Sequence, residues 1–179
     1  ATYEGLPKTL YESIDQQTGV CWVRYPRGAE GKLPAGFAPD EAWSVRSISP
    51  KSPRKKLGLV TYGKETVQVC KAAEQLKEQG IAVSVLKLLR LLPFPEDSLR
   101  PLMGCDAILF VEEGIQSGGI GQMFGEKLLE RQYRGEYRIL AVDNRLVEQA
   151  STDRALALAG LDAAGIARTC QTWLGIAAD

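Results

Sequence analysis

Residues 106–129 combine a short apolar strand pattern, a glycine-rich connection and an amphipathic helix pattern. Residues 107–111 are almost wholly apolar, which is typical of a strand covered on both faces. Further along, Ile120, Phe124 and Leu128 recur at the i, i+4, i+8 spacing of one buried helix face. The segment therefore predicts a strand, a loop and a helix, and we expect the other elements to assemble around them.

The loop between this strand and helix contains Gly118, Gly119 and Gly121, and glycine loops of this kind can bind phosphate. It matches neither the dinucleotide-binding fingerprint nor a P-loop, because no Lys-Ser/Thr pair follows and no acid stands at the expected spacing. Glu112 and Glu113, directly before the loop, would also repel an anion. We therefore favour a tight connection, in which the glycines let the helix lie close to its neighbours, over a nucleotide site.

Strand and helix patterns alternate along the rest of the chain. Strands are predicted at 57–62, 81–86, 107–111 and 137–142, with an additional edge strand at 43–48, and helices at 65–79, near Glu96 and after the capping residue Asp162. Alternation at this spacing predicts an α/β fold with a mainly parallel sheet, helices on both faces and right-handed crossovers. The last helix carries an apolar stripe formed by Ile166, Cys170, Trp173 and Leu174.

The beginning of the chain follows a different plan. Residues 6–14 have the spacing of a helix and 20–25 are β-prone, yet one helix and one strand cannot bury themselves. We expect residues 1–27 to be the tail of a preceding domain, 28–56 to be a linker with an edge strand, and 57–179 to be the main domain. The first residue is not Met and no signal-peptide pattern follows, which favours a fragment of a longer protein.

Composition excludes several classes of function. Lys plus Arg and Asp plus Glu are equal at 22 each, so no net positive charge favours nucleic acid. No apolar run approaches the roughly 18 residues that a membrane span needs. The chain has no histidine, the usual general acid or base near neutral pH, and we assign no catalytic residue and no metal ligand. We expect neither a nucleic acid nor a membrane as partner.

The four cysteines are widely spaced and each lies in an apolar pattern, so they predict reduced, buried thiols of a cytoplasmic protein. They are Cys21, Cys70, Cys105 and Cys170. Residues 46–56 carry five basic side chains and no acid. We interpret this segment as a solvated face or a contact with an acidic surface elsewhere in a larger protein.

The sharpest motif is VRYPRG at residues 23–28. Arg24 and Arg27 flank a rigid Tyr-Pro pair at the end of the predicted strand, and strand ends meet ligands in open α/β sheets. Guanidinium groups match phosphate oxygens with paired donors, which predicts substrate binding by Arg24 and Arg27. Two surface arginines without a ligand are the alternative.

Five motifs occur in a familiar order and spacing: VRYPRG, GLVTYGKET, VEEGIQSGGIGQM, NRLVEQAS and GLDAAGI. Together they resemble the C-terminal third of the 1-deoxy-D-xylulose-5-phosphate synthase family, which are thiamine-diphosphate-dependent enzymes of the transketolase type. The resemblance covers nearly the whole chain. It implies a three-layer α/β/α domain with a mostly parallel five-stranded sheet and one antiparallel edge strand.

The resemblance also implies a function for the complete enzyme. Such enzymes condense pyruvate with glyceraldehyde 3-phosphate and release carbon dioxide, at the start of the non-mevalonate isoprenoid route. Thiamine diphosphate and Mg²⁺ are held by upstream domains, so none is expected in this fragment, which we expect to be inactive alone. Residues 1–27 would end the pyrimidine-binding domain, Arg27 would lie near the acceptor phosphate, and the complete enzyme would be a cytoplasmic homodimer.

Two departures from the family pattern leave other acceptors open. The chain reads LKLLRLLPFPED where the family has Arg-Phe and Lys-Pro-Leu-Asp, and 141–143 replace a Gly-Leu/Ile-Pro. Alternative assignments are a transketolase proper, the β subunit of a 2-oxo acid dehydrogenase, or a free-standing module that assembles with a separate catalytic chain. GLDAAGI argues against the first two.

Overall fold

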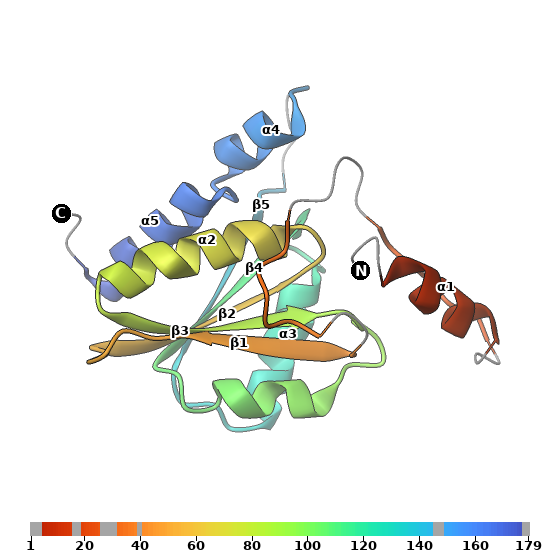
Figure 1. Cartoon of the computed structure of the whole chain (residues 1–179), viewed down its shortest axis with the longest axis horizontal. Helices are drawn as coiled ribbons and strands as arrows, with labels where there is room; N and C mark the ends of the chain where they lie inside the picture. Colours follow the sequence, from red (N-terminus) through yellow and green to blue (C-terminus); the bar gives the residue numbers. More distant parts are fainter. Residues whose placement is uncertain (1–4, 16–18, 26–31, 39–40, 145–148, 177–179) are drawn as a thin grey trace.

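The computed structural model describes residues 5–15, 19–25, 32–38, 41–144 and 149–176. The elements in these ranges are α1 (Leu6–Asp15), β1 (Trp43–Ile48), β2 (Lys55–Tyr62), α2 (Glu65–Glu78), β3 (Ile81–Leu88), the 3₁₀ helix η1 (Glu96–Leu102), β4 (Ala107–Ile115), α3 (Ile120–Glu130), β5 (Glu136–Val142), α4 (Thr152–Ala159) and α5 (Ala163–Leu174). They form a three-layer α/β/α arrangement, and α1 stands apart from it (Figure 1).

The five strands form one sheet in the order β1-β3-β2-β4-β5. β2 pairs in parallel with β3 and with β4, and β4 pairs in parallel with β5. β1 pairs antiparallel with β3, with Trp43 opposite Leu88 and Ile48 opposite Val83. The predicted fold class is therefore confirmed, including the antiparallel strand at one edge.

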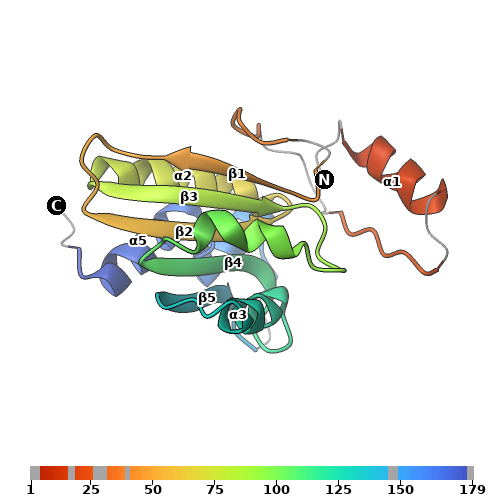
Figure 2. The same cartoon turned by 90° about the horizontal axis from the view of Figure 1, so that it is seen from below.

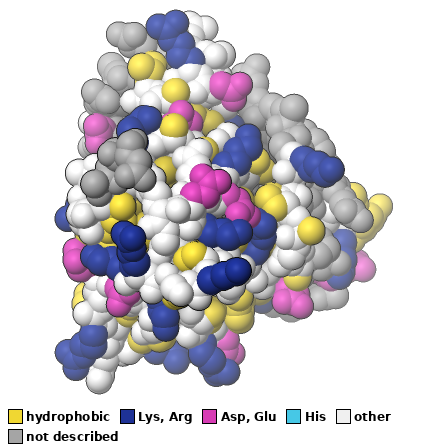
Figure 3. All heavy atoms as spheres, turned by 60° about the vertical axis from the view of Figure 1, so that its left-hand side comes forward, with side chains coloured by type: hydrophobic (Ala, Val, Ile, Leu, Met, Phe, Trp, Pro, Cys, Tyr) yellow, Lys and Arg dark blue, Asp and Glu magenta, His cyan; other side chains and the backbone are white. Residues whose placement is uncertain are grey.

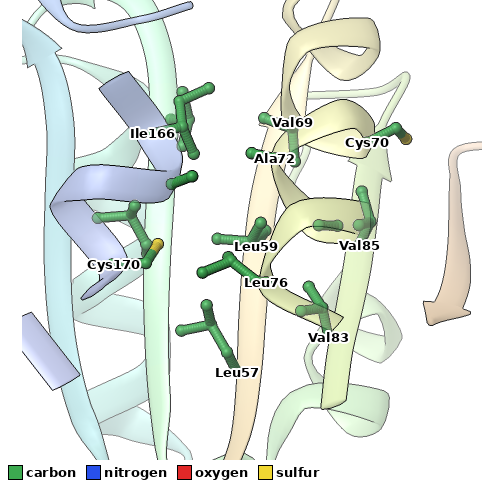
Figure 4. Packing of buried hydrophobic residues seen from close by; sticks show 14 of the residues in the cluster. Leu57, Leu59, Val69, Cys70, Ala72, Leu76, Val83, Val85, Ile166 and Cys170 are labelled. Atoms are coloured by element: carbon green, nitrogen blue, oxygen red, sulfur yellow. The ribbon is translucent and has the colours of Figure 1, made fainter. Parts of the chain in front are cut away.

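α2 and α5 cover one face of the sheet, and η1 and α3 cover the other (Figure 2). On the first face, Leu57 and Leu59 of β2 meet Leu76 of α2, while α5 adds Ile166 and Cys170 (Figure 4). All five are buried. The buried side chains of α2 and the predicted apolar stripe of α5 thus form the core on this side.

The second core is richer in aromatic rings. Phe110 of β4 packs on Phe124 of α3 with ring centroids 5.2 Å apart, and Phe94 meets Phe124 edge-on at 5.7 Å. Leu99 and Leu102 bring η1 onto the same cluster. A short helix near Glu96 was predicted, and the structure forms it as a 3₁₀ helix with Pro101 inside it.

The helix predicted over 6–14 is present as α1, but none of its residues is buried. Residues 20–25, predicted as a strand that completes the sheet of a preceding domain, form no strand in this chain, and Val20, Trp22 and Tyr25 are exposed. A strand needs a neighbouring strand for its backbone hydrogen bonds, and none lies beside this segment in the described structure.

Other differences are smaller. Cys70, Cys105 and Cys170 are buried as predicted, whereas Cys21 is exposed because it lies in the uncovered segment before the sheet. Asp162 caps α5 as predicted, accepting a hydrogen bond from the Gly165 N–H at 2.8 Å. α4 was not predicted; it is short and only Leu156 of it is buried.

Candidate functional site

The parallel strands β2, β3 and β4 end at one edge of the sheet, where open α/β folds bind their ligands. Polar side chains from two neighbouring connections gather there. Tyr62, Lys64 and Glu65 come from the end of β2 and the start of α2, and Glu112 and Glu113 come from β4. We define these five residues as the carboxyl-edge cluster.

Glu112 is the centre of the cluster and is almost completely buried, with 1% of its surface exposed. Its carboxylate accepts the Tyr62 hydroxyl at 3.0 Å and the backbone N–H groups of Ile120 at 3.2 Å and Gly121 at 3.0 Å. These two N–H groups belong to the first turn of α3, which has no other intrahelical acceptor for them. Glu112 therefore neutralises the positive end of the α3 dipole from within the domain.

These hydrogen bonds determine whether the glycine loop can bind a phosphate group. A phosphate bound at the α3 N-terminus would need the N–H groups that Glu112 already occupies. Gly118 has a left-handed backbone with φ of 76°, and a Cβ at Gly119 would overlap the Glu112 carboxylate. The glycines serve a tight strand-to-helix connection, and the α3 N-terminus does not fit a diphosphate.

The tyrosines around Glu112 are held in their neutral form. Burial, the Glu112 charge and the hydrogen bond to Glu112 raise the pKa of Tyr62 far above its usual value, and the charge of Arg24 opposes this rise. Burial and Glu112 also raise the pKa of Tyr137, whose hydroxyl donates to the Gly121 carbonyl. Neutral phenols can only donate to these acceptors, which fixes the direction of both hydrogen bonds.

Glu65 is the second buried carboxyl of the cluster, with 2% of its surface exposed. Burial and the neighbouring Glu113 carboxyl raise its pKa to about 8, while Lys64 acts in the opposite direction. Lys64 pairs with Glu113 at 3.0 Å. One cation thus stands beside two carboxyl groups at the start of α2.

Of the two predicted phosphate ligands, Arg24 and Arg27, the structure describes only Arg24. Arg24 is exposed. Its charge acts to lower the pKa of Tyr62, so residues 19–25 pass near the carboxyl edge. Figures 1 and 2 agree that the N-terminal helix α1 lies on this side of the sheet. Arg27 lies outside the described residues. In the described ranges, no group of three His, Cys, Asp or Glu side chains forms a candidate metal site.

The stripe of small residues on α3 packs inside the domain. A Cβ at Gly125 would come within 2.7 Å of Tyr137 Cε1, and one at Gly121 within 3.0 Å of Ile139 Cγ2. α3 uses these glycines to approach β5 closely, as expected of a helix lying near its neighbours. They are therefore not free to bring a partner subunit close.

The basic segment 46–56 lies toward the opposite edge of the sheet and has contacts within the domain. Arg46 pairs with Glu74 at 3.0 Å, and Lys55 Nζ donates to the Leu174 carbonyl at the end of α5. Figure 3 shows this side with basic side chains interspersed among acidic and apolar ones. For the basic segment, the structure favours the interpretation of a partly solvated face.

Among the described residues, no helix is both long and apolar enough to cross a membrane.

The family model for the transketolase C-terminal domain matches residues 47–166. The chain belongs to the transketolase C-terminal domain family. The matched region of this transketolase domain runs from the end of β1 into α5 and contains the carboxyl-edge cluster. The α/β/α arrangement described above is the fold of this domain.

Curated relatives of this transketolase domain are longer proteins. A 1-deoxy-D-xylulose-5-phosphate synthase from Synechococcus sp. (strain JA-3-3Ab) is 31% identical over 166 residues, covering 90% of this chain and 25% of that protein. The synthase of Thermobifida fusca is 29% identical and covers 91% and 26%. The chain therefore spans about a quarter of the length of the curated relatives it matches.

Solved structures give the same fold. A chain described as "Split gene transketolase, inactive beta4 tetramer" superposes with a TM-score of 0.67 at 24% identity, covering 80% of this chain and 47% of that one. A transketolase mutant from Pichia stipitis has a TM-score of 0.51 at 19% identity, covering 73% and 18%. At these identities the likeness establishes the transketolase C-terminal fold.

The sequence pattern predicts Glu112 and Glu113 only as charges that repel an anion. The signal for the role of Glu112 was its position, since an acid that ends a buried strand one short loop before a helix can reach back to that helix N-terminus. Glu65 gave no signal. An acid in the first turn of a helix is common and usually exposed, and its burial follows from tertiary packing.

Proposed function

We propose that this chain is the C-terminal domain of a thiamine-diphosphate-dependent 1-deoxy-D-xylulose-5-phosphate synthase. Such an enzyme condenses pyruvate with glyceraldehyde 3-phosphate, in the synthesis of isoprenoid and thiamine precursors. The observation that carries the proposal is the extent of similarity to the Synechococcus synthase, which covers 90% of the chain. That is more than the region 47–166 matched by the general transketolase model, so the likeness includes sequence outside the common domain.

In this proposal the domain contributes binding and assembly, and other parts of the enzyme contribute the reacting groups. Thiamine diphosphate, which supplies the chemistry of pyruvate decarboxylation and carbon transfer, and Mg²⁺ are held by upstream domains. The occupied N-terminus of α3 supports this division, because Glu112 takes the N–H groups that a diphosphate would need. The isolated fragment is inactive.

The acceptor phosphate is the ligand of Arg27, with Arg24 as its supporting cation. The position of Arg24 supports this assignment, since its charge acts on Tyr62 at the edge where the parallel strands end. A guanidinium group pairs two donors with phosphate oxygens, which gives the site its preference for a phosphorylated aldehyde.

The segment 1–27 is the tail of a preceding pyrimidine-binding domain, and 28–56 is a linker that includes the edge strand β1. Exposed apolar side chains support this division. Tyr11, Ile14, Val20 and Trp22 are each at least 73% exposed, and a preceding domain would cover them. The strand predicted at 20–25 would then form by pairing with that domain's sheet.

The complete enzyme is a homodimer, is cytoplasmic and takes small-molecule substrates. The solved relative named as a tetramer supports self-assembly in this fold class. The small residues Gly121 and Gly125 of α3 do not contribute to the contact between subunits, since both pack on β5. The buried free thiols Cys70, Cys105 and Cys170 support a reducing compartment.

The test is to express the chain with its upstream coding sequence and assay carbon dioxide release from pyruvate with glyceraldehyde 3-phosphate as acceptor. Product formation that needs both substrates and thiamine diphosphate supports the proposal. A xylulose 5-phosphate donor working in place of pyruvate would instead assign a transketolase. Activity restored only by adding a separately encoded catalytic chain would identify a free-standing assembly module.

A further inference from the structure

Glu65 has an unusual environment for a carboxyl group. Only 2% of the surface of Glu65 is exposed. Among the described residues, neither of its carboxyl oxygens has a hydrogen-bond partner. A carboxylate in this position would be desolvated without compensation, which is among the most costly arrangements in a protein. The group beside it is Glu113, a second carboxyl that in its charged form also has only acceptors.

Two carboxyl groups can form a hydrogen bond when one of them carries a proton. Glu113 already pairs with Lys64 at 3.0 Å and is 38% exposed at its side chain, so the negative charge is best accommodated there. A protonated Glu65 then donates to Glu113, and its burial costs far less. In the described structure, the charged groups that act on Glu65 are Lys64, before α2, and Glu113, on β4.

We propose that Glu65 and Glu113 form a proton-binding pair that joins the start of α2 to the end of β4 at the carboxyl edge. The bound proton is the ligand, and Lys64 balances the one remaining negative charge. Loss of the proton leaves two neighbouring carboxylates with Lys64 as the cation beside them. The edge of the sheet is then held less firmly, because the two connections repel each other.

The pair also acts on the neighbouring network. The charge of Glu113 is one of the groups that raise the pKa of Tyr62, and Tyr62 donates to Glu112, the residue that caps α3. A change in protonation at Glu65 and Glu113 therefore acts through Tyr62 on Glu112, the other buried carboxyl group at this edge. The proposal does not depend on which substrate the complete protein uses.

The direct test is a carbon NMR titration of the 179-residue chain with labelled glutamate side chains. One carboxyl resonance is expected to titrate near pH 8, and it should be absent in Glu65→Gln and present in Glu78→Gln, an exposed control on the same helix. In Glu113→Gln the amide can donate to Glu65 and Lys64 is freed to pair with it, so the titration should move to lower pH.

A second measurement covers the case of a poorly folding variant. Between the ordinary pKa of glutamate and about 8, the folded wild-type chain holds one proton more than the unfolded chain. Its unfolding equilibrium constant should therefore rise toward tenfold per pH unit in this window, relative to Glu65→Gln. The proposal is overturned if no glutamate titrates above pH 6, or if Glu113→Gln leaves the titration unchanged.

Discussion

The Tyr62 hydroxyl donates to Glu112 Oε2 at 3.0 Å, and this single bond connects the ends of two adjacent parallel strands. Glu112 in turn accepts from the first turn of α3, so one carboxylate links β2, β4 and a helix. Because Glu112 is buried, its charge is stabilised mainly by these three donors. At the edge where ligands are expected, Glu112 thus joins the ends of β2 and β4 to the start of α3.

Replacing Tyr62 with Phe should destabilise the domain by roughly 1–3 kcal/mol, the usual cost of losing a hydrogen bond to a charged group. Urea denaturation monitored by circular dichroism measures this change. Tyr11→Phe is the matched control, since Tyr11 is exposed on α1 and should change stability by less than about 0.5 kcal/mol. Equal stability of the two variants would contradict a structural role for the Tyr62 bond.

Gly125→Ala should destabilise the domain although alanine favours helices by up to about 1 kcal/mol over glycine. The new Cβ would lie 2.7 Å from Tyr137 Cε1, and the resulting shift costs about 1–3 kcal/mol. Thermal or urea unfolding tests the sign. Gly104→Ala, where a Cβ meets nothing within 4 Å, should be neutral.

A double variant tests whether contact with the Tyr137 ring causes the destabilisation. In a Tyr137→Leu background the ring that the Cβ would strike is absent, so adding Gly125→Ala should no longer destabilise. If Gly125→Ala destabilises both backgrounds equally, the close approach of α3 to β5 is not the cause.

One of the four thiols should react with a disulfide reagent in the native chain, and four should react after unfolding. Cys21 is exposed, whereas burial raises the pKa of Cys105 to about 11 and that of Cys170 to about 12. Burial also raises the pKa of Cys70. Since the thiolate is the reactive form, these three should react slowly. Cys21→Ser should remove the fast phase, and a remaining fast phase would show that the core opens.

Arg27→Ala in the complete enzyme should lower kcat/KM for the phosphorylated aldehyde by roughly ten- to a hundredfold, as expected for one charge-assisted bond to phosphate. Steady-state assays with glyceraldehyde 3-phosphate and with unphosphorylated glyceraldehyde separate phosphate binding from chemistry. The handling of pyruvate should change little. Arg154→Ala, an exposed arginine on α4, serves as the control. Unchanged kinetics for the phosphorylated aldehyde would leave Arg27 a surface arginine.

The sheet and its core could be predicted because their signals are local and repeated. Leu57, Leu59 and Val60 lie in an almost continuous apolar run, which predicts a strand buried on both faces, and the structure buries all three side chains. The segment at 20–25 has an equally good β pattern and forms no strand. Pattern predicts what a segment can form, and a neighbouring strand decides whether it does.

The carboxyl-edge cluster could not be predicted from the sequence, because it is formed by tertiary contacts between connections that are far apart in the chain. Tyr62 and Glu112 are 50 residues apart, and no local spacing relates them. Glu65 stands in the first turn of α2, where an acid is ordinarily solvent-exposed and favourable to the helix dipole. β4 continues beyond its predicted end and carries Glu113, whose carboxyl group acts on Glu65.

The strand order has a consequence for how the chain is made. β1 leaves the ribosome before the other four strands of its sheet, yet its partner is β3, which follows β2 and α2 in the sequence. At roughly 5–20 residues per second, β1 waits a few seconds with its hydrogen-bonding edge unpaired. β2, α2 and β3 can meanwhile form a right-handed unit on their own. During synthesis the edge strand is thus a late addition to a sheet that grows from β2, and a chaperone that binds exposed strands would find β1 before its partner exists.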